Sequence, residues 1–420
     1  MKKAKIILLI TALAVIIAAF AVMINMSGGG SEFIKNYGAN FQKNWQALTK
    51  NLHLSKQDTP SAETQNSDDT QTSSDTAEET PVPDLSDNAK KADGKLIDTV
   101  SNKVVAFENA SSVKYISYKG QLICSDQNSL MAFNADGESL WALAMSAQNP
   151  ILKSSGNYIL LAEKGGTKIN LLIDKKLIYT VNTENPIINA SVSSSGDVVA
   201  VTEKSDYRGA IVVYNKSGEK VYEWNSGSND VIDADISASS RNVAAALLNT
   251  DSGTKGIVQF FDINQTEPYA VQEFDDTVVF DVQFLGGTLN AVCDNKIIGF
   301  SANGKVSWTT DFGGKLLTKY KLSDSGFKTL VFDNSSSAEI QILNKSGKER
   351  TDTKNETIPD FTDIFSNRIT YNNGRKLVLG DFTGKNFKYY QTEQDIKNAV
   401  ILNADTVVIV YNGSLEFCRF

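Results

Sequence analysis

Six aspartates in two short stretches are the residues of this chain best suited to chemistry: Asp230, Asp233, Asp235, Asp275, Asp276 and Asp281. Carboxylates gathered in this way can bind a cation or a polar ligand, and a converging pair can act as the acid and base of a glycoside hydrolase. The competing interpretation, which we favour, is that they are solvated turn residues or line a channel without a ligand. The elements that carry them decide between the two.

Other catalytic chemistry finds little support in the sequence. The single histidine, His53, lies outside residues 89–420, so that region has no imidazole for a Ser–His or Cys–His nucleophile or for a zinc site. The chain has no Walker loop, no GxGxxG between a strand and a helix, and no GxSxG. Cys124, Cys293 and Cys418 each sit in an apolar run and are predicted to be buried thiols; a Cys124–Cys418 pair would require the chain ends to meet. We expect no cofactor.

The charge of the chain is unevenly distributed. The net charge of −8 comprises +6 in residues 1–56, −9 in residues 57–88 and −5 in residues 89–420. A nucleic-acid-binding domain needs clustered Lys and Arg to displace phosphate counterions, and the acidic main region has none. We therefore exclude nucleic acid as a partner.

The N-terminus reads as a membrane anchor. Lysines in the short tail 1–5 precede an uncharged apolar segment, and residues 6–26 are long enough to span a bilayer. The positive-inside rule then places the tail in the cytoplasm and the rest of the chain outside it, at the cell membrane. A cleaved signal peptide is the alternative, because Ala19-Phe20-Ala21 resembles a cleavage site.

Two further segments separate the anchor from the main region. In residues 31–56, apolar and aromatic side chains recur every three or four positions, which predicts an amphipathic helix on the membrane surface or, alternatively, a self-association helix. Residues 57–94 are rich in Thr, Ser, Asp and Glu and poor in large apolar residues. That composition is typical of a disordered acidic linker.

Residues 95–420 consist of short β-strand patterns with an internal repeat. An apolar strand, an Asn-x-x-Gly turn and a second strand recur at 130–143, 211–224, 297–308 (with Ser in place of Asn) and 341–351. The turn glycines, spaced 81, 86 and 43 residues apart, indicate a unit of about 40 residues. Trp141, Trp224 and Trp308 follow three of these turns, and we interpret them as wedges packed between neighbouring units and not as ligand platforms.

Four short strands per 40-residue unit predict an all-β, eight-bladed β-propeller, with seven blades as the alternative. Innermost strands are expected to begin near eight positions: Val113, Ile151, Ile187, Val231, Val278, Lys315, Asp360 and Ile396. The six candidate aspartates are then expected at or within innermost strands, where they could ring the mouth of the central channel. The last unit has room for three strands only. We expect the run 103–107 to supply its fourth, so that both ends of the region close the ring.

The repeat resembles that of the quinoprotein-like (PQQ-repeat-like) propeller superfamily, most clearly in Leu130–Trp141. Its non-enzymatic members include a lipoprotein of the outer-membrane β-barrel assembly machinery. The quinone-dependent members use a Cys-Cys pair that this chain lacks, so the resemblance implies the non-enzymatic branch. The order of anchor, acidic linker and propeller also resembles a family of Gram-positive membrane proteins of unknown function.

The sequence therefore predicts a membrane-anchored propeller outside the cytoplasm. We expect it not to be an enzyme but to bind or scaffold an envelope protein or polymer. The alternative is an extracellular hydrolase that uses carboxylates at the channel mouth.

Overall fold

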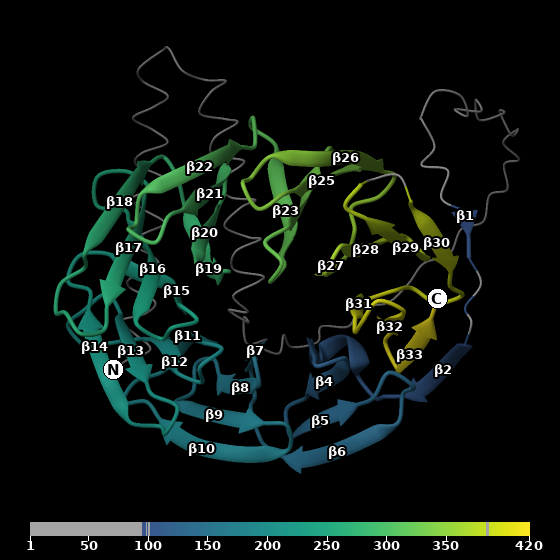
Figure 1. Cartoon of the computed structure of the whole chain (residues 1–420), viewed down its shortest axis with the longest axis horizontal. Helices are drawn as coiled ribbons and strands as arrows, with labels where there is room; N and C mark the ends of the chain where they lie inside the picture. The colour runs from purple at the N-terminus through teal and green to yellow at the C-terminus, as the bar shows by residue number, and fades with distance from the viewer. Residues whose placement is uncertain (1–94, 98, 100, 384–385) are drawn as a thin grey trace, which may run out of the picture. The chain divides into compact units, whose positions relative to one another are not determined.

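The computed structural model describes residues 95–97, 99, 101–383 and 386–420. In this part of the chain, eight antiparallel four-stranded sheets succeed one another around a central axis, and one of them has a fifth strand (Figure 1). This is the predicted all-β, eight-bladed propeller, and the seven-bladed alternative is wrong. The predicted tail, anchor, amphipathic helix and linker lie outside the described residues.

The two inner layers of the ring contain sixteen strands. The innermost strands of blades one to eight are β3 (Lys114–Tyr118), β7 (Pro150–Ser155), β11 (Ile187–Val192), β15 (Asp230–Ile236), β19 (Val279–Leu285), β23 (Leu316–Leu322), β27 (Thr362–Phe365) and β31 (Asn398–Ile401). The second strands are β4 (Gln121–Ser125), β8 (Tyr158–Glu163), β12 (Val198–Thr202), β16 (Asn242–Asn249), β20 (Thr288–Cys293), β24 (Lys328–Asp333), β28 (Arg368–Asn373) and β32 (Thr406–Val410). Every innermost strand begins within two residues of its expected position.

The outer layers follow the same order. The third strands are β5 (Ser129–Phe133), β9 (Lys168–Ile173), β13 (Ala210–Tyr214), β17 (Lys255–Asp262), β21 (Lys296–Phe300), β25 (Ala338–Leu343), β29 (Lys376–Asp381) and β33 (Ser414–Arg419). The outermost strands are β6 (Ser139–Ala144), β10 (Lys176–Asn182), β14 (Lys220–Asn225), β18 (Ala270–Asp275), β22 (Val306–Asp311), β26 (Glu349–Asn355), β30 (Lys388–Gln391) and β2 (Ser101–Ala106). Two short elements complete the description: β1 (Lys95–Leu96), which pairs parallel with β30, and the 3₁₀ turn η1 (Ala110–Ser112).

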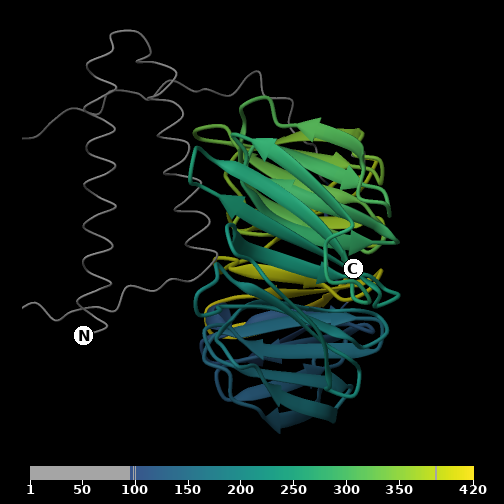
Figure 2. The same cartoon turned by 90° about the vertical axis from the view of Figure 1, so that its left-hand side faces the viewer.

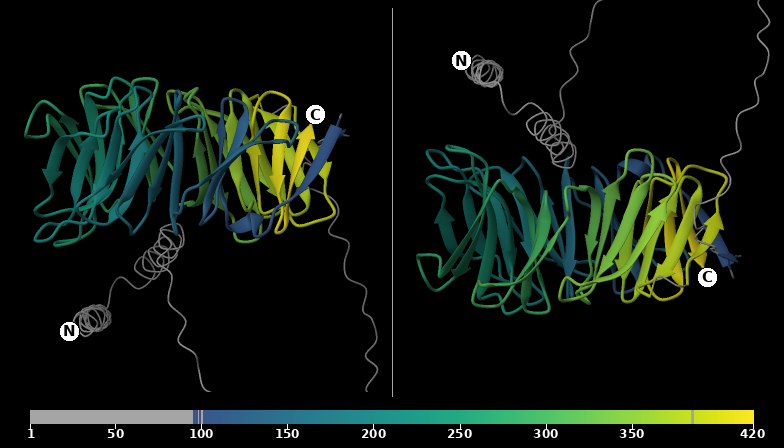
Figure 3. Two further views of the ribbon diagram at one scale, coloured as in Figure 1. Left: turned by 90° about the horizontal axis from the view of Figure 1, so that it is seen from below. Right: turned by 90° about the horizontal axis from the view of Figure 1, so that it is seen from above.

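The strands run between two faces of the ring, seen edge-on in Figures 2 and 3. We call the face where one sheet leads to the next the connection face, and the opposite one, which carries the Asn-x-x-Gly turns, the turn face. In the first of these turns the Asn134 side-chain oxygen accepts hydrogen bonds from the amides of Asp136 and Glu138, at 3.0 and 2.9 Å. Gly137 has a φ of 73°, a left-handed conformation that glycine adopts without strain. The Asn-x-x-Gly turn predicted from the repeat is confirmed at this position.

The hydrophobic core lies in layers between neighbouring blades. Trp141 packs against the cluster shared by blades one and two, and Trp224 against the one shared by blades three and four. Trp308 fits so closely against the next blade that a Cβ on Gly347 would lie 2.1 Å from its ring. The three tryptophans are therefore packing wedges, as expected. The three cysteines are free and buried in strands.

The ring is closed by its N-terminal strand. All six residues of β2 pair antiparallel with β33, the last strand of the chain, so blade eight contains both ends of the domain. The buried Glu416 on β33 reinforces this closure by accepting hydrogen bonds from Asn102 on β2, from Tyr390 on blade seven and from Tyr411, at 3.0, 2.9 and 2.5 Å. The predicted closure is confirmed.

None of the described residues forms a helix long and apolar enough to cross a membrane.

Candidate functional site

Three of the six candidate aspartates lie together on innermost strands. Asp233 and Asp235 belong to β15, and Asp281 belongs to β19 on the next blade. The side chains of Asp233 and Asp235 are directed into the seam between the two blades, where the residues are only 1% and 9% exposed. These carboxyls are thus embedded in the wall of the ring.

Both buried carboxyls bind the backbone of the neighbouring blade. Asp233 Oδ2 accepts a hydrogen bond from the Val282 amide at 2.9 Å, and Asp235 Oδ2 accepts one from the Phe284 amide at 2.7 Å. Asp233 Oδ1 also accepts a hydrogen bond from Asn189 Nδ2 at 2.5 Å. An innermost strand has a free edge, and a buried amide there is costly unless it finds an acceptor. The aspartates supply that acceptor.

The same kind of contact crosses every seam of the ring. Polar side chains on or next to innermost strands join successive blades through eight links: Ser154 Oγ to Ser117 O, Lys153 Nζ to Ser191 Oγ, Asn189 to Asp233, Asp233 to the Val282 amide, Asp281 to the Tyr320 hydroxyl, Lys321 to Asp363, Asp363 to the Ile401 amide, and Ser117 Oγ to Leu402 O. Asp233, Asp235 and Asp281 thus belong to one sector of this seam network.

Burial makes the acidic sector electrostatically unusual. Desolvation raises the pKa of Asp233 well above its ordinary range, and the neighbouring Asp281 carboxyl adds to this effect while Lys153 opposes it. Desolvation also raises the pKa of Asp235 to about 6, again against the attraction of Lys153. It raises the pKa of Tyr320 too, reinforced by Asp281. Perturbed groups of this kind occur both at active sites and in structural networks, so geometry has to decide.

The other three candidates lie elsewhere. Asp230, at the first residue of β15, is half-exposed and 3.5 Å from the Arg208 guanidinium. Asp275 is the last residue of the outermost strand β18, so the expectation that it lies at an innermost strand is wrong. Asp276 lies in the exposed turn between β18 and β19, with a φ of 49°. The structure therefore divides the predicted site into a trio at the seam, of which Asp233 and Asp235 are buried and Asp281 is half-buried, and three peripheral residues.

Sequence reasoning missed the partners of the trio, although one signal was present. Asn189, Asp233 and Asp281 each lie two residues after an apolar residue of their innermost strand. These apolar residues are Ile187, Val231 and Val279, and in each strand the pairing register shifts between the apolar residue and the polar one. Aligning the units on these apolar residues would have placed the three polar side chains at one level of the ring. Lys153 and Tyr320 gave no comparable signal.

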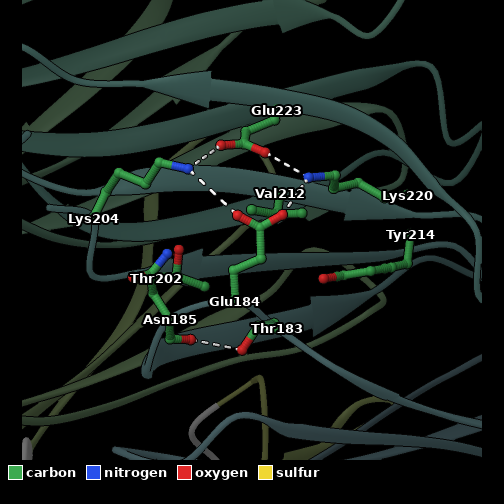
Figure 4. Close-up of a pocket in the computed structure, with 9 residues that line it drawn as sticks. All are labelled: Thr183, Glu184, Asn185, Thr202, Lys204, Val212, Tyr214, Lys220 and Glu223. Carbon is green, nitrogen blue, oxygen red and sulfur yellow. Dashed lines mark hydrogen bonds and ion pairs between the residues drawn. The ribbon is translucent and has the colours of Figure 1, made fainter.

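A small recess lies on the third blade (Figure 4). Lys204 and Lys220 alternate there with Glu184 and Glu223 as four ion pairs, at 2.7–3.7 Å. The cavity is about 10 Å³, room for about one water molecule. With its charges paired and so little space, the recess is a structural ion-pair cluster.

Replacing Asp235 with asparagine should stabilise the protein at neutral pH. The pKa of Asp235 is raised to about 6 in the folded state, so the folded protein favours the protonated carboxyl. The stability that this group contributes is therefore full below about pH 4 and is lost as the pH rises through 6. The amide of Asp235→Asn can still accept the Phe284 hydrogen bond but carries no charge. We expect about 2 kcal/mol of added stability at pH 8 and little difference at pH 3.5, measured by urea unfolding. Equal stability of both proteins at pH 8 would contradict this reading.

Comparison with models of known protein families identifies the family of this chain. The model of the family of unknown function DUF5711 matches residues 96–420. The chain belongs to this family. The matched region begins within β1 and ends at the last residue, so it covers all eight blades. No curated protein matches the sequence.

Solved structures share the fold. The computationally designed protein Ika8 aligns with a TM-score of 0.59 at 12% identity, covering 76% of this chain and 100% of its own. Sqt1 from Saccharomyces cerevisiae gives 0.56 at 8% identity, with 77% and 98% covered. BamB from Moraxella catarrhalis gives 0.49 at 11%, with 77% and 99% covered. Ika8 and Sqt1, with TM-scores above 0.5, share the propeller architecture of this chain. At identities this low the likeness shows the fold alone, so any activity has to be argued from the residues.

Proposed function

We propose that this protein is a binding or scaffolding module at the cell envelope, held at the membrane by residues 6–26 with its propeller outside the cytoplasm. The use of Asp233 and Asp235 as acceptors for backbone amides engages these carboxyls in the structure, which weighs against a catalytic role and so favours a non-enzymatic one. Propellers commonly bind partners through the loops on their faces. The apolar N-terminal segment and its flanking lysines support the anchor and its orientation.

The alternative of an extracellular hydrolase is less well supported. A glycosidase needs two carboxyls facing a substrate across an open site. Asp233 and Asp235 are buried in a blade seam and bonded to the next strand. Asp275, at the other end of the predicted site, lies on an outermost strand. The carboxyls therefore do not form the solvent-facing pair that this chemistry requires.

Two positions on the third blade allow the proposal to be tested. Tyr207, 47% exposed, lies in the loop between β12 and β13 on the connection face. Lys216 lies at the other end of β13, in the Asn-x-x-Gly turn of the turn face. A photo-crosslinking amino acid at each position, in intact cells, would capture whatever touches that face.

We expect capture of a distinct envelope component from one of the two faces, with the other position as the matched control. A cysteine at position 207 should also react with a membrane-impermeant maleimide in intact cells. Reaction only after lysis would overturn the location outside the cytoplasm. Absence of any captured component at both positions would overturn the binding role.

A further inference from the structure

Two lysines from neighbouring blades lie at the inner rim of the connection face. Lys114 is the first residue of the innermost strand β3 on blade one. Lys164 directly follows β8 on blade two, and its amide donates to Asn149 O, just before innermost strand β7, at 2.9 Å. Its backbone also forms a bridge to Ile187, the first residue of innermost strand β11. Because β3 and β7 lie side by side, both lysines belong to the same part of this rim.

The carboxylates closest to these lysines in the chain are engaged by backbone amides. Asp126, which follows β4, accepts hydrogen bonds from two amides of its own loop with one oxygen, at 2.8 and 2.6 Å. Glu163, the residue before Lys164, accepts a hydrogen bond from the Gln148 amide at 3.1 Å. Among the described residues, no carboxylate contributes to the pKa of Lys114 or of Lys164. The two ammonium groups are therefore not neutralised by their surroundings.

The other basic residues in the connecting loops of this face do have carboxylate partners. Four of them form ion pairs: Lys204 with Glu223, Arg208 with Asp230 and Asp251, Lys315 with Glu339, and Arg375 with Asp395. A fifth, Lys397, lies close enough to Asp395 to help lower the pKa of that carboxyl. Within these loops, all of which the structure describes, Lys164 is the exception.

The two unpaired charges also repel one another. Partial burial lowers the pKa of Lys164, and the charge of Lys114 lowers it further. Although Lys114 is exposed to solvent, the protein around it displaces enough water to lower its pKa as well. The charged form of each lysine is therefore the unfavourable one in the folded protein. An anion that contacts both ammonium groups would relieve the repulsion and favour the charged forms.

We propose that Lys114 and Lys164 bind a phosphate group, free or carried on a larger molecule. A phosphate monoester carries a charge of about −1.5 to −2 at neutral pH and so matches two ammonium groups, whereas a carboxylate matches one. Lysine binds phosphate as a point charge and needs no planar, bidentate fit. This inference rests on the binding role proposed above and gives that role a face and a ligand chemistry.

The melting temperature of the purified full chain in detergent micelles measures the binding. Inorganic phosphate, at about tenfold excess over its dissociation constant, should raise this temperature by roughly 2 °C relative to chloride at equal ionic strength. Lys114→Gln and Lys164→Gln should each lose most of the shift. Glucose 6-phosphate is the second probe: a larger shift than with inorganic phosphate assigns the site to a group on a larger molecule, and a smaller one assigns it to the free anion.

Lys168→Gln is the matched control. Lys168 is half-buried, as Lys164 is, but it begins β9, one strand further from the axis than β8. Its substitution removes the same charge and should keep the phosphate shift. An equal loss in all three variants would show diffuse attraction and overturn the proposal, as would a wild-type chain that phosphate does not stabilise beyond chloride.

A second readout separates binding from a structural role of the two lysines. Because their charges are unfavourable, Lys164→Gln should melt no lower than wild type when phosphate is absent. A lower melting temperature there would overturn the proposal in favour of a structural role. These measurements use the purified chain, so their failure leaves capture of an envelope component in cells untouched, and failed capture leaves phosphate binding intact.

Discussion

A chain lacking residues 101–106 should lose the cooperative unfolding of the whole propeller. The deletion removes β2, leaves the edge of β33 unpaired and takes away the Asn102 donor of buried Glu416. Val105, which packs into the core between blades eight and one, is removed, and Phe107, which packs there too, loses the strand that holds it. The ring is held together by contacts between successive blades. Opening it at one seam therefore exposes the facing sides of the two blades that meet there. We expect the melting temperature to fall by on the order of 10 °C or more.

Calorimetry of the deletion variant is the measurement, with two comparisons. Removing residues 57–88, which lie in the predicted acidic linker, should leave the melting temperature unchanged. Truncating Cys418–Phe420, at the end of β33, should act in the same direction as loss of β2. A β2 deletion that still unfolds in one transition at the wild-type temperature would show that the ring does not depend on its closing strand.

Substituting Asp233 should give opposite results according to whether the new side chain can accept hydrogen bonds. Asp233→Ala leaves the buried Val282 amide and the Asn189 side chain without their acceptor, and unsatisfied buried donors cost about 1–3 kcal/mol each. We expect a loss of about 3 kcal/mol or more for this variant. Asp233→Asn keeps an acceptor oxygen and removes the buried charge.

The asparagine variant is therefore the matched control. Burial raises the pKa of Asp233, so the ionised form is the unfavourable one in the folded protein. At pH 8 we expect Asp233→Asn to be at least as stable as wild type, and the two variants to differ by several kcal/mol in urea unfolding. If both variants lose the same stability, the carboxyl has a role that neither hydrogen bonding nor burial explains.

The architecture was predictable because its signals are local. An Asn-x-x-Gly turn fixes the end of one strand and the start of the next, and its recurrence sets the length of a blade. Apolar runs between the turns then placed all eight innermost strands to within two residues. The closing strand followed from counting, since the last unit was one strand short. Local chemistry and strand count were sufficient.

The candidate site was only partly predictable because its contacts join different blades. Asp233 and the Val282 amide are separated by 49 residues, and their meeting depends on the register shifts near Val231 and Val279. Asp275 was misplaced because it stands close before an apolar run that does form an innermost strand; the structure ends β18 there instead. Seam contacts of this kind follow from the geometry of the closed ring and not from any short pattern.

Hydrogen exchange at the amides of Val282 and Phe284 tests most directly whether the aspartates serve the seam between blades four and five. Both amides lie on the free edge of an innermost strand and would exchange quickly without an acceptor. Slow exchange in the wild-type protein, with selective loss of protection at Val282 in Asp233→Ala and at Phe284 in Asp235→Ala, is the predicted result. Rapid exchange of both amides in the wild-type protein would contradict it and would return the carboxyls to consideration as a ligand site.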